Sequence, residues 1–255
     1  MQSWKQAVAR AFDAAEGYDG AAAIQAEVAA RLAERIAGAS RAAAPRILEV
    51  GCGTGLLTAA LARQRGRGIL VASDIAPAMI QRCRARLTGA ANLHVTVMDA
   101  ERPCLAPGFD LIASSLAAQW FEDLPGTLAR LSALLAPGGL MAVATLAEGT
   151  FAEWRAAHAA LGLEAATPRY PALAELAGLS LPGCTLAVSG EPVIEVHADG
   201  RAFLGALRAI GAGTPGTRDI LSAGALRRVL RLFEAGGARV TYEVATLLIR
   251  RREQG

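Results

Sequence analysis

Residues 47 to 55 read Ile-Leu-Glu-Val-Gly-Cys-Gly-Thr-Gly, an apolar run that enters a turn with three glycines. Glycines at positions 51, 53 and 55 remove side chains where the backbone must turn tightly and approach a ligand. Asp74 ends the next apolar run, where an acidic side chain can accept hydrogen bonds from ribose hydroxyls. The glycine turn and Asp74 together predict a binding site for an adenosine-bearing cofactor.

The spacing of the glycines separates two classes of cofactor site. Dinucleotide-dependent oxidoreductases use G-x-G-x-x-G, whose third glycine would fall at position 56, where this chain has Leu. The observed pattern, with Glu49 ahead of the glycines, resembles the E-x-G-x-G-x-G motif of class I S-adenosylmethionine-dependent methyltransferases. In these enzymes the methionine part of the cofactor lies over the loop. A tight turn between a strand and a helix, with no ligand, is the alternative.

Length and composition favour one large α/β domain over residues 1–255, because the chain has 255 residues and 53% of them are apolar. The formal net charge is only +3, and Lys5 is the single lysine among 26 basic residues. Such a small charge gives no reason to expect a nucleic-acid partner.

The four cysteines are far apart, with no C-x-x-C pair and no histidine at metal-ligand spacing: Cys52, Cys83, Cys104 and Cys184. We expect free thiols in a reducing compartment and no metal site. The N-terminus has no apolar signal-like stretch, and no span approaches the ~18 apolar residues of a membrane helix. These features predict a cytoplasmic protein without a membrane segment.

Strand and helix patterns alternate through the first part of the chain. Helix-like spacing over 3–14 and 20–38 places N-terminal helices, within residues 1–40, before the first strand. Beyond them we expect strands over 46–50, 69–73, 93–97, 109–114 and 139–145, with helices over 55–64, 77–87 and 124–134. This alternation predicts a doubly wound, mostly parallel, Rossmann-like sheet, with residues 46–146 as the cofactor-binding core. Leu135 to Gly139 is read as a helix stop before the last of these strands.

After residue 150 the pattern changes. We expect helices over 151–161, 171–177, 199–210 and 222–235, and strands over 184–196 and 239–250. Two long final strands without room for a standard crossover predict an antiparallel C-terminal edge. The helices within 199–235 are expected to form a lid together with residues 1–20.

Residues that follow the third and fourth strands are candidates for ligand contacts. Asp99 is placed to accept a hydrogen bond from the exocyclic amine of an adenine, while Ile75 and Ala100 pack on the ring faces; a turn-forming Asp is the alternative. Gln119 and Trp120 follow the fourth strand, where an amide and a large ring can orient a substrate. Packing against the next helix is the alternative for Trp120.

No Ser-His-Asp set or paired-acid motif is visible, and the three histidines are scattered. A carboxylate that attacks a sulfonium methyl group needs no general base, because it is already ionised at neutral pH. An O-methyltransferase acting on an acid can therefore work mainly by alignment and exclusion of water.

Further stretches along the chain form a recognisable pattern: Phe12 to Asp19 with Gln25, Ser114 to Trp120 (similar to S-N-L-A-x-Q-W), Thr145 to Thr150, Arg169-Tyr170 (similar to N-R-F), Leu207 to Ala212 (similar to L-K-x-I-G-A) and Thr241-Tyr242. Through these stretches the whole chain resembles the malonyl-acyl-carrier-protein O-methyltransferase family of biotin biosynthesis. The resemblance implies methyl transfer from S-adenosyl-L-methionine to the free carboxylate of a malonyl thioester. The thioester would be carried by acyl carrier protein or by coenzyme A, and the methyl ester masks a charge so that fatty-acid elongation accepts the primer.

The resemblance also implies a set of site residues. The substrate-side candidates are Tyr18, Gln119, Trp120, Arg169 and Arg208, of which the two arginines would grip the malonyl carboxylate. The cofactor-side candidates are Glu49, Gly51, Gly53, Gly55, Asp74, Ile75, Asp99, Ala100 and Ser114. The chain departs from the family pattern in having Ser115 for Asn, Arg208 for Lys, and Pro168 for the Asn before Arg169. For either arginine, a solubilising surface role is the alternative.

Two further interpretations of the function remain open. A methyltransferase for another small acid, such as trans-aconitate, shares a similar aromatic motif after the fourth strand. An adenosine-binding regulator without catalytic activity would keep the same cofactor residues.

The C-terminal segment is basic, because residues 218–255 carry eight arginines against four acids. Arg227 and Arg231 share a helix face. This charge predicts a docking surface for an acidic carrier protein, and a solvated helix surface is the alternative.

Overall fold

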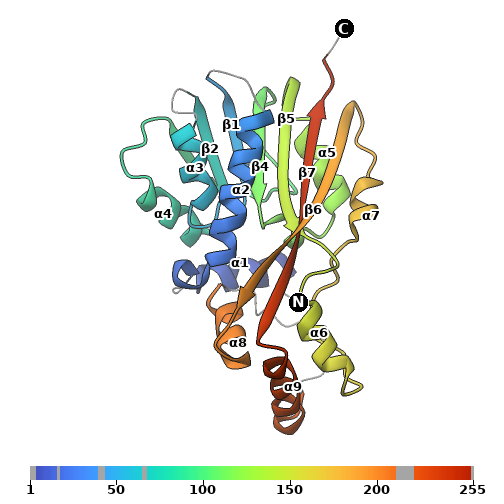
Figure 1. The fold of residues 1–255 in the computed structure, drawn as a ribbon. Coiled ribbons are helices and arrows are strands. Elements are labelled where there is room, and N and C mark those ends of the chain that lie inside the picture. The colour runs from blue at the N-terminus through green and yellow to red at the C-terminus, as the bar shows by residue number, and fades with distance from the viewer. Residues whose placement is uncertain (1–3, 16–17, 40–43, 65–67, 211–220, 254–255) are drawn as a thin grey trace.

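A computed structural model of the chain describes residues 4–15, 18–39, 44–64, 68–210 and 221–253. Its strands form a seven-stranded sheet in the order β3-β2-β1-β4-β5-β7-β6. The strands are β1 (Arg46–Val50), β2 (Ile69–Asp74), β3 (Leu93–Val97), β4 (Phe109–Ser115), β5 (Leu135–Leu146), β6 (Cys184–Val196) and β7 (Arg239–Arg251). The first five strands run parallel, and β7 is antiparallel to both β5 and β6. The predicted doubly wound sheet with an antiparallel C-terminal edge is confirmed (Figure 1).

Helices cover both faces of this sheet. They are α1 (Trp4–Asp13), α2 (Ala23–Ala39), α3 (Leu56–Gln64), α4 (Pro77–Arg86), α5 (Leu124–Ser132), α6 (Ala152–Ala159), α7 (Leu173–Ala177), α8 (Gly200–Ala209) and α9 (Ala223–Ala235), with short 3₁₀ turns η1 (Tyr18–Ala21) and η2 (Ala118–Trp120). One hydrophobic core lies beneath α2 and α3 and continues to α6, α8 and α9. A second core lies beneath α5 and α7.

Local sequence explains why these elements form where they do. Ile24, Val28, Leu32 and Ile36 are buried at four-residue spacing, so α2 presents one apolar stripe to the sheet. Strand β1 is buried at every position after Arg46, as expected for a parallel strand covered on both faces. Three helices begin with side-chain caps: Asp123 accepts from Gly126 N (α5), Asp199 from Ala202 N (α8) and Ser222 from Ala225 N (α9).

The predicted start of the fifth strand was wrong. Strand β5 begins at Leu135, which pairs with Phe109, and the register shifts between Phe109 and Leu111. The Pro-Gly-Gly stretch therefore lies in an irregular first part of the strand, where Gly138 has a φ of +74°. A bulge accommodates proline and glycine inside a strand. Because these residues are also typical of loops, the sequence predicted a strand start at residue 139, four residues after the observed start at Leu135.

The long strands β6 and β7 extend beyond the parallel part of the sheet and carry α8 and α9 at one end, beside α6 (Figure 1). An aromatic cluster holds this lobe together: Trp154 of α6 lies 5.4 Å, centroid to centroid, from both Phe203 of α8 and Phe233 of α9. Helix α8 also contacts η1, which lies near the glycine turn. Among the described helices, none has the length and apolar character that crossing a bilayer requires.

Candidate cofactor and active site

A pocket lies at the carboxyl ends of β1, β2 and β3, which is where doubly wound sheets bind their ligands. Seven of the nine predicted cofactor residues line it: Glu49, Gly51, Gly53, Asp74, Ile75, Asp99 and Ala100. The other two, Gly55 and Ser114, do not. Ser114 is buried with 1% of its surface exposed, and its neighbour Ser115 lines the pocket instead.

The glycine turn adopts the backbone conformation that its sequence suggests. Gly51, Gly53 and Gly55 have φ values of +68°, +53° and +89°, a region that residues with side chains rarely occupy. A Cβ on Gly51 would lie 2.2 Å from the Cβ of Ala117, and one on Gly55 would lie 3.0 Å from Sγ of Cys83. Gly51 and Gly55 thus allow the turn to pack against its neighbours, whereas a Cβ on Gly53 would meet only the hydroxyl of Tyr18, at 3.8 Å.

Asp74 connects the glycine turn to the start of α4. Its Oδ2 accepts a hydrogen bond from Gly53 N at 2.9 Å, and its Oδ1 accepts one from Ala76 N at 2.9 Å. Burial raises the pKa of Asp74, and these backbone donors oppose that effect. Each carboxylate oxygen retains a second lone pair, so Asp74 can still accept hydrogen bonds from a ligand.

Glu49 lies at the end of β1 with 1% of its surface exposed. Burial raises the pKa of this carboxyl group to about 8, although Thr58 hydrogen-bonds to it. Its Oε2 has no hydrogen-bond partner among the described residues. A buried, unpaired carboxylate oxygen in a pocket wall is a favourable neighbour for a cationic ligand group, because such a group restores the solvation that burial removed.

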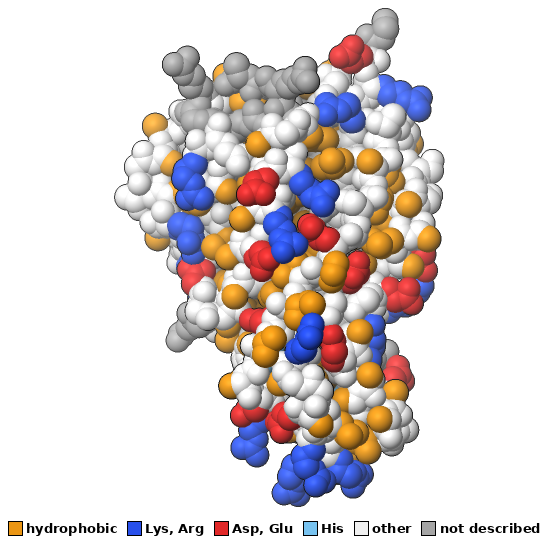
Figure 2. Space-filling model, in the orientation of Figure 1, with side chains coloured by type: hydrophobic (Ala, Val, Ile, Leu, Met, Phe, Trp, Pro, Cys, Tyr) orange, Lys and Arg blue, Asp and Glu red, His pale blue; other side chains and the backbone are white. Residues whose placement is uncertain are grey.

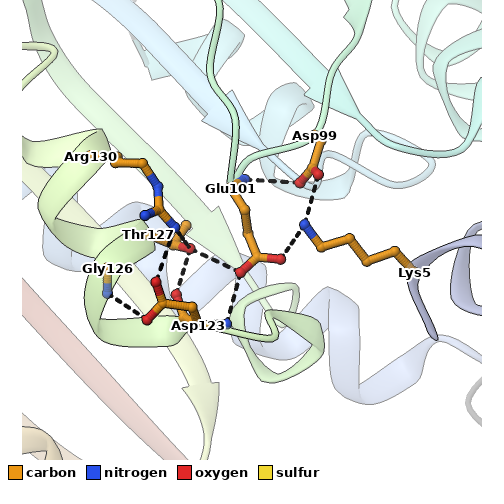
Figure 3. A network of polar contacts seen from close by, with 7 residues as sticks. All are labelled: Lys5, Asp99, Glu101, Asp123, Gly126, Thr127 and Arg130. Carbon is orange, nitrogen blue, oxygen red and sulfur yellow. Dashed lines mark hydrogen bonds and ion pairs between the residues drawn. The ribbon is translucent and has the colours of Figure 1, made fainter. Parts of the chain in front are cut away.

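Asp99 belongs to a polar network that reaches the N-terminal helix (Figure 3). Lys5 of α1 donates to Asp99 Oδ2 at 2.7 Å and also forms an ion pair with Glu101. Asp99 Oδ1 accepts from Glu101 N at 2.9 Å. Glu101 Oε1 in turn accepts from Asp123 N at 2.8 Å and from the Thr127 hydroxyl at 3.2 Å.

Sequence reasoning missed Lys5 and Glu101, although both line the pocket. No local motif marks either residue. The one available signal was compositional: Lys5 is the single lysine in a chain that otherwise uses arginine.

Aromatic side chains from the N-terminal segment cover one side of the pocket. Tyr18 lines the pocket, and burial raises its pKa above the usual value for a phenol, so the side chain stays neutral. The Phe12 ring packs edge-on against Trp120, with centroids 5.5 Å apart. The predicted substrate-side residues Tyr18 and Trp120 are therefore together at the pocket. Trp120 thus lines the pocket and packs on α1, whereas the predicted alternative was packing against the helix that follows it in the chain.

The remaining substrate-side candidates do not line this pocket. Gln119 donates from Nε2 to the carbonyl of Leu116 at 2.7 Å, so its amide supports the η2 turn. Arg169 pairs with Glu175 at 2.7 Å, and 83% of its side chain is exposed. Arg208 lies on α8 beside a separate hollow between α8 and α9. The arrangement thus does not bring either arginine to the glycine turn.

Among the described residues, no group of three or more His, Cys, Asp or Glu side chains is positioned to hold a metal ion. All four cysteines are free thiols, and Cys52 and Cys83 are buried near the glycine turn. No histidine lines the pocket.

Comparison with known proteins identifies the relatives of this chain. Residues 47–139 match the family described as a methyltransferase domain. The chain is 48% identical to the biotin biosynthesis bifunctional protein BioCD of Bordetella avium over 94% of its own length, but it spans only 51% of that longer protein. It is 39% identical to the malonyl-[acyl-carrier protein] O-methyltransferase of Magnetococcus marinus, over 93% of this chain and 89% of that one.

Solved structures with low sequence identity support the fold. The YcgJ protein of Bacillus subtilis superposes with a TM-score of 0.63 at 15% identity, covering 88% of this chain and 98% of that one. The [4+2]-cyclase SpnF superposes with a TM-score of 0.56 at 17% identity, covering 88% of this chain and 81% of that one. Since the fold carries different chemistries, function must be argued from the site and the close relatives.

A further relative agrees with the first two. The malonyl-[acyl-carrier protein] O-methyltransferase of Halorhodospira halophila is 35% identical over 94% of this chain and 85% of that one. These matches run through the N-terminal helices and the C-terminal lobe as well as the cofactor-binding core. The chain therefore belongs to the malonyl-[acyl-carrier protein] O-methyltransferase family of class I methyltransferases.

Proposed function

We propose that this protein methylates the free carboxylate of a malonyl thioester on acyl carrier protein, with S-adenosyl-L-methionine as methyl donor. The observation that carries the proposal is the acidic pocket at the glycine turn, in a chain whose relatives are named for this reaction. The donor would carry positive charge on its sulfonium and amino groups, and four acidic side chains line the pocket: Glu49, Asp74, Asp99 and Glu101, the last two of which also pair with Lys5. Opposite charges at short range favour binding.

Individual residues have distinct roles in holding the donor. Asp74 would accept hydrogen bonds from the ribose hydroxyls, and Asp99 would accept one from the adenine amine, with Ile75 and Ala100 beside the ring. Glu49 would pair with the amino group, for which its unpaired Oε2 is suited. The donor supplies an electrophilic methyl group that bonds to a carboxylate oxygen of the substrate as the methyl–sulfur bond breaks and a neutral thioether leaves.

The protein's own contribution to the reaction is alignment and exclusion of water. The malonyl carboxylate is ionised at neutral pH, so no side chain has to remove a proton. The absence of histidine from the pocket lining, within the described residues, agrees with such a reaction. Phe12, Tyr18 and Trp120 cover the reacting groups and remove water that would compete for the methyl group.

The carrier protein docks on the lobe formed by α8 and α9. Leu204, Leu226 and Leu230 form an apolar floor there. Around them stand five arginines for which the described residues provide no ion-pair partner: Arg201, Arg208, Arg227, Arg228 and Arg231. Figure 2 shows basic side chains gathered at this tip of the molecule. Such a surface fits an acidic carrier whose phosphopantetheine arm is itself anionic.

The docking surface is continuous with the cover of the pocket, since α8 contacts η1 and Tyr18 of η1 lines the pocket. An arm attached to a carrier on α8 and α9 therefore has a route along η1 to the glycine turn. On this view Arg208 contributes to carrier docking, a different role from the carboxylate grip suggested by sequence.

A substrate panel tests the proposal against its nearest rival. The protein is incubated with S-adenosylmethionine and, separately, malonyl, succinyl and acetyl carrier protein, malonyl coenzyme A and free trans-aconitate. Formation of S-adenosylhomocysteine is measured for each substrate. We expect the highest rate with malonyl carrier protein and none with the acetyl form, which lacks a free carboxylate. Faster turnover of trans-aconitate would instead support a small-acid methyltransferase.

A further inference from the structure

We propose that Lys5 is a positioning residue that fastens the N-terminal helix α1 across the adenine end of the pocket and so slows release of the cofactor. This inference rests on the proposed function for the identity of the cofactor. It goes beyond that function because neither the motif nor the resemblance gives Lys5 a role.

The first observation is the geometry of the Lys5 contacts (Figure 3). The ammonium group of Lys5 lies 2.7 Å from Asp99 Oδ2 and is also paired with Glu101. The exposed fraction of the side chain is 19% for Lys5, 28% for Asp99 and 6% for Glu101. Ion pairs that are this far removed from solvent are screened less than pairs on the open surface.

The second observation is that the two acidic partners are held without help from α1. Glu101 accepts from Asp123 N and the Thr127 hydroxyl, at the start of α5. Asp99 accepts from Glu101 N within its own loop. The receiving carboxylates thus form a fixed site on the sheet and α5, and the Lys5 side chain brings α1 to it.

The third observation is how α1 is attached at its other end. Asp13 Oδ1 accepts from Ala78 N at 2.8 Å, and Arg82 donates to the carbonyl of Ala15 at 2.7 Å. Both contacts join the C-terminal end of α1 to α4. Lys5 lies in the first turn, at the opposite end of the helix. When the Lys5 pairs break, that first turn is released while the C-terminal end stays anchored.

The face of α1 that would move is the face that covers the pocket. Lys5, Val8 and Phe12 all line the pocket and follow one another at helical spacing. Opening the Lys5 end therefore uncovers Asp99, the residue assigned to the adenine. A ligand that leaves the pocket must await this opening, and Lys5 sets how often it occurs.

The test measures dissociation of S-adenosylhomocysteine by stopped-flow or surface plasmon resonance. This ligand carries no sulfonium charge, which limits the direct electrostatic effect of removing Lys5. For Lys5→Met we expect dissociation to accelerate by ~10-fold or more, with a smaller change in association, because affinity changes within one site arise mainly in dissociation. Lys5→Arg retains both ion pairs and should release the ligand nearly as slowly as the wild type.

Two further variants control for charge and folding. Arg102→Met removes an exposed positive charge next to Glu101 and should leave dissociation unchanged. In Lys5→Met alone, the buried Glu101 carboxylate loses the ammonium group that pairs with it, which can destabilise the fold. The double variant Lys5→Met, Glu101→Gln removes this unpaired charge. It should therefore fold, and it should release the ligand as fast as Lys5→Met. Wild-type dissociation rates in both Lys5→Met variants would overturn the proposal. If even the wild type fails to bind S-adenosylhomocysteine, the proposed function fails instead.

The single lysine permits a second measurement on the unaltered protein. An amine-reactive reagent should modify Lys5 faster when α1 opens, because the side chain is then more exposed than the 19% of the closed form. Peptide mass spectrometry reports this modification rate separately from that of the N-terminal amine. We expect saturating S-adenosylhomocysteine to slow modification of Lys5 by ~10-fold or more, because ligand that binds the closed form reduces the open fraction. Equal modification rates with and without ligand would contradict the role assigned to Lys5.

Discussion

The four carboxylates that line the pocket differ in how each is held. Both oxygens of Asp74 accept backbone hydrogen bonds, and Asp99 and Glu101 share Lys5. Glu49 keeps one oxygen without a partner among the described residues. The acidic side chains therefore have three different roles. Asp74 stabilises the glycine turn, Asp99 and Glu101 bind α1 through Lys5, and Glu49 is suited to bind a cationic ligand group.

Replacing Asp74 tests the ribose contact. We expect Asp74→Ala to weaken binding of S-adenosylhomocysteine by about 1–3 kcal/mol, because charge-assisted hydrogen bonds are lost. Isothermal calorimetry gives the affinity, and circular dichroism checks that the variant is folded, since Asp74 also supports the glycine turn. A folded variant with wild-type affinity would remove Asp74 from the site.

Glu49 predicts a link between cofactor binding and pH. Its pKa is raised to about 8, so near neutral pH the free protein carries a proton on this group. A bound ammonium group favours the ionised carboxylate and lowers that pKa, so binding releases a proton. Affinity should therefore rise between about pH 6 and pH 8 and level off above the pKa of the free protein.

Calorimetry in buffers of different ionisation enthalpy measures that proton release. Glu49→Gln has no proton to release and should lose the pH dependence while remaining folded. If the wild type and Glu49→Gln release the same number of protons, Glu49 does not face the ligand amino group.

For single residues, the sequence motif predicted Glu49, Gly51, Gly53 and Asp74, which all line the pocket, because their places follow from one strand, one turn and the next strand. It did not point to Glu101, which also lines the pocket. It could not predict the Lys5 contact with Asp99, which depends on where α1 packs in three dimensions. Arg169 and Arg208 were suggested because they lie in segments that match the family and because a guanidinium group can hold a carboxylate. One pairs with the nearby Glu175 and the other lies on the α8 surface.

Among the elements, periodicity located nearly every helix and strand, and β1, β3 and β6 have the predicted bounds. The error at β5 arose because proline and glycine mark both loops and bulges, and only pairing with β4 distinguishes the two. The antiparallel C-terminal edge was predicted, and α8 and α9 lie in the connection between β6 and β7 without making these strands parallel. The position of β7 between β5 and β6 was not predicted, because it depends on which strand edges pair in three dimensions.

The N-terminal and C-terminal helices are expected to respond to ligand more than the sheet does. A lid must be among the less stable parts of a structure, whereas the parallel strands lie in the buried core. Hydrogen exchange with and without S-adenosylhomocysteine should show added protection concentrated in α1, η1 and α8. Uniform protection across the sheet, with no response in these elements, would argue against a lid over 1–20 and 199–235.

For the molecule as a whole, the lobe of α8 and α9 separates the place of carrier docking from the place of chemistry. The double variant Arg227→Glu, Arg231→Glu should slow methylation of malonyl carrier protein at low salt, by ~10-fold or more, because electrostatic steering of the encounter is lost. Rising salt should reduce the difference from the wild type, since the charges are then screened.

Two controls separate docking from folding and from the active site. The double variant Arg63→Glu, Arg84→Glu makes the same charge change at exposed positions on α3 and α4 and should methylate the carrier substrate normally. Malonyl coenzyme A has no protein surface, so its methylation should change little in either variant. An equal loss on both substrates would mean that Arg227 and Arg231 act through folding or the active site.

The reaction itself is tested most directly by intact mass spectrometry of malonyl carrier protein after incubation with S-adenosylmethionine and this enzyme. We predict that the malonyl carrier gains one methyl group, located by fragmentation on the free carboxylate of the malonyl group. Acetyl carrier protein should remain unmodified, and Asp74→Ala should slow the gain. A malonyl carrier that stays unmodified by an enzyme that binds S-adenosylhomocysteine, or a methyl group found on the carrier polypeptide, would contradict the proposed function.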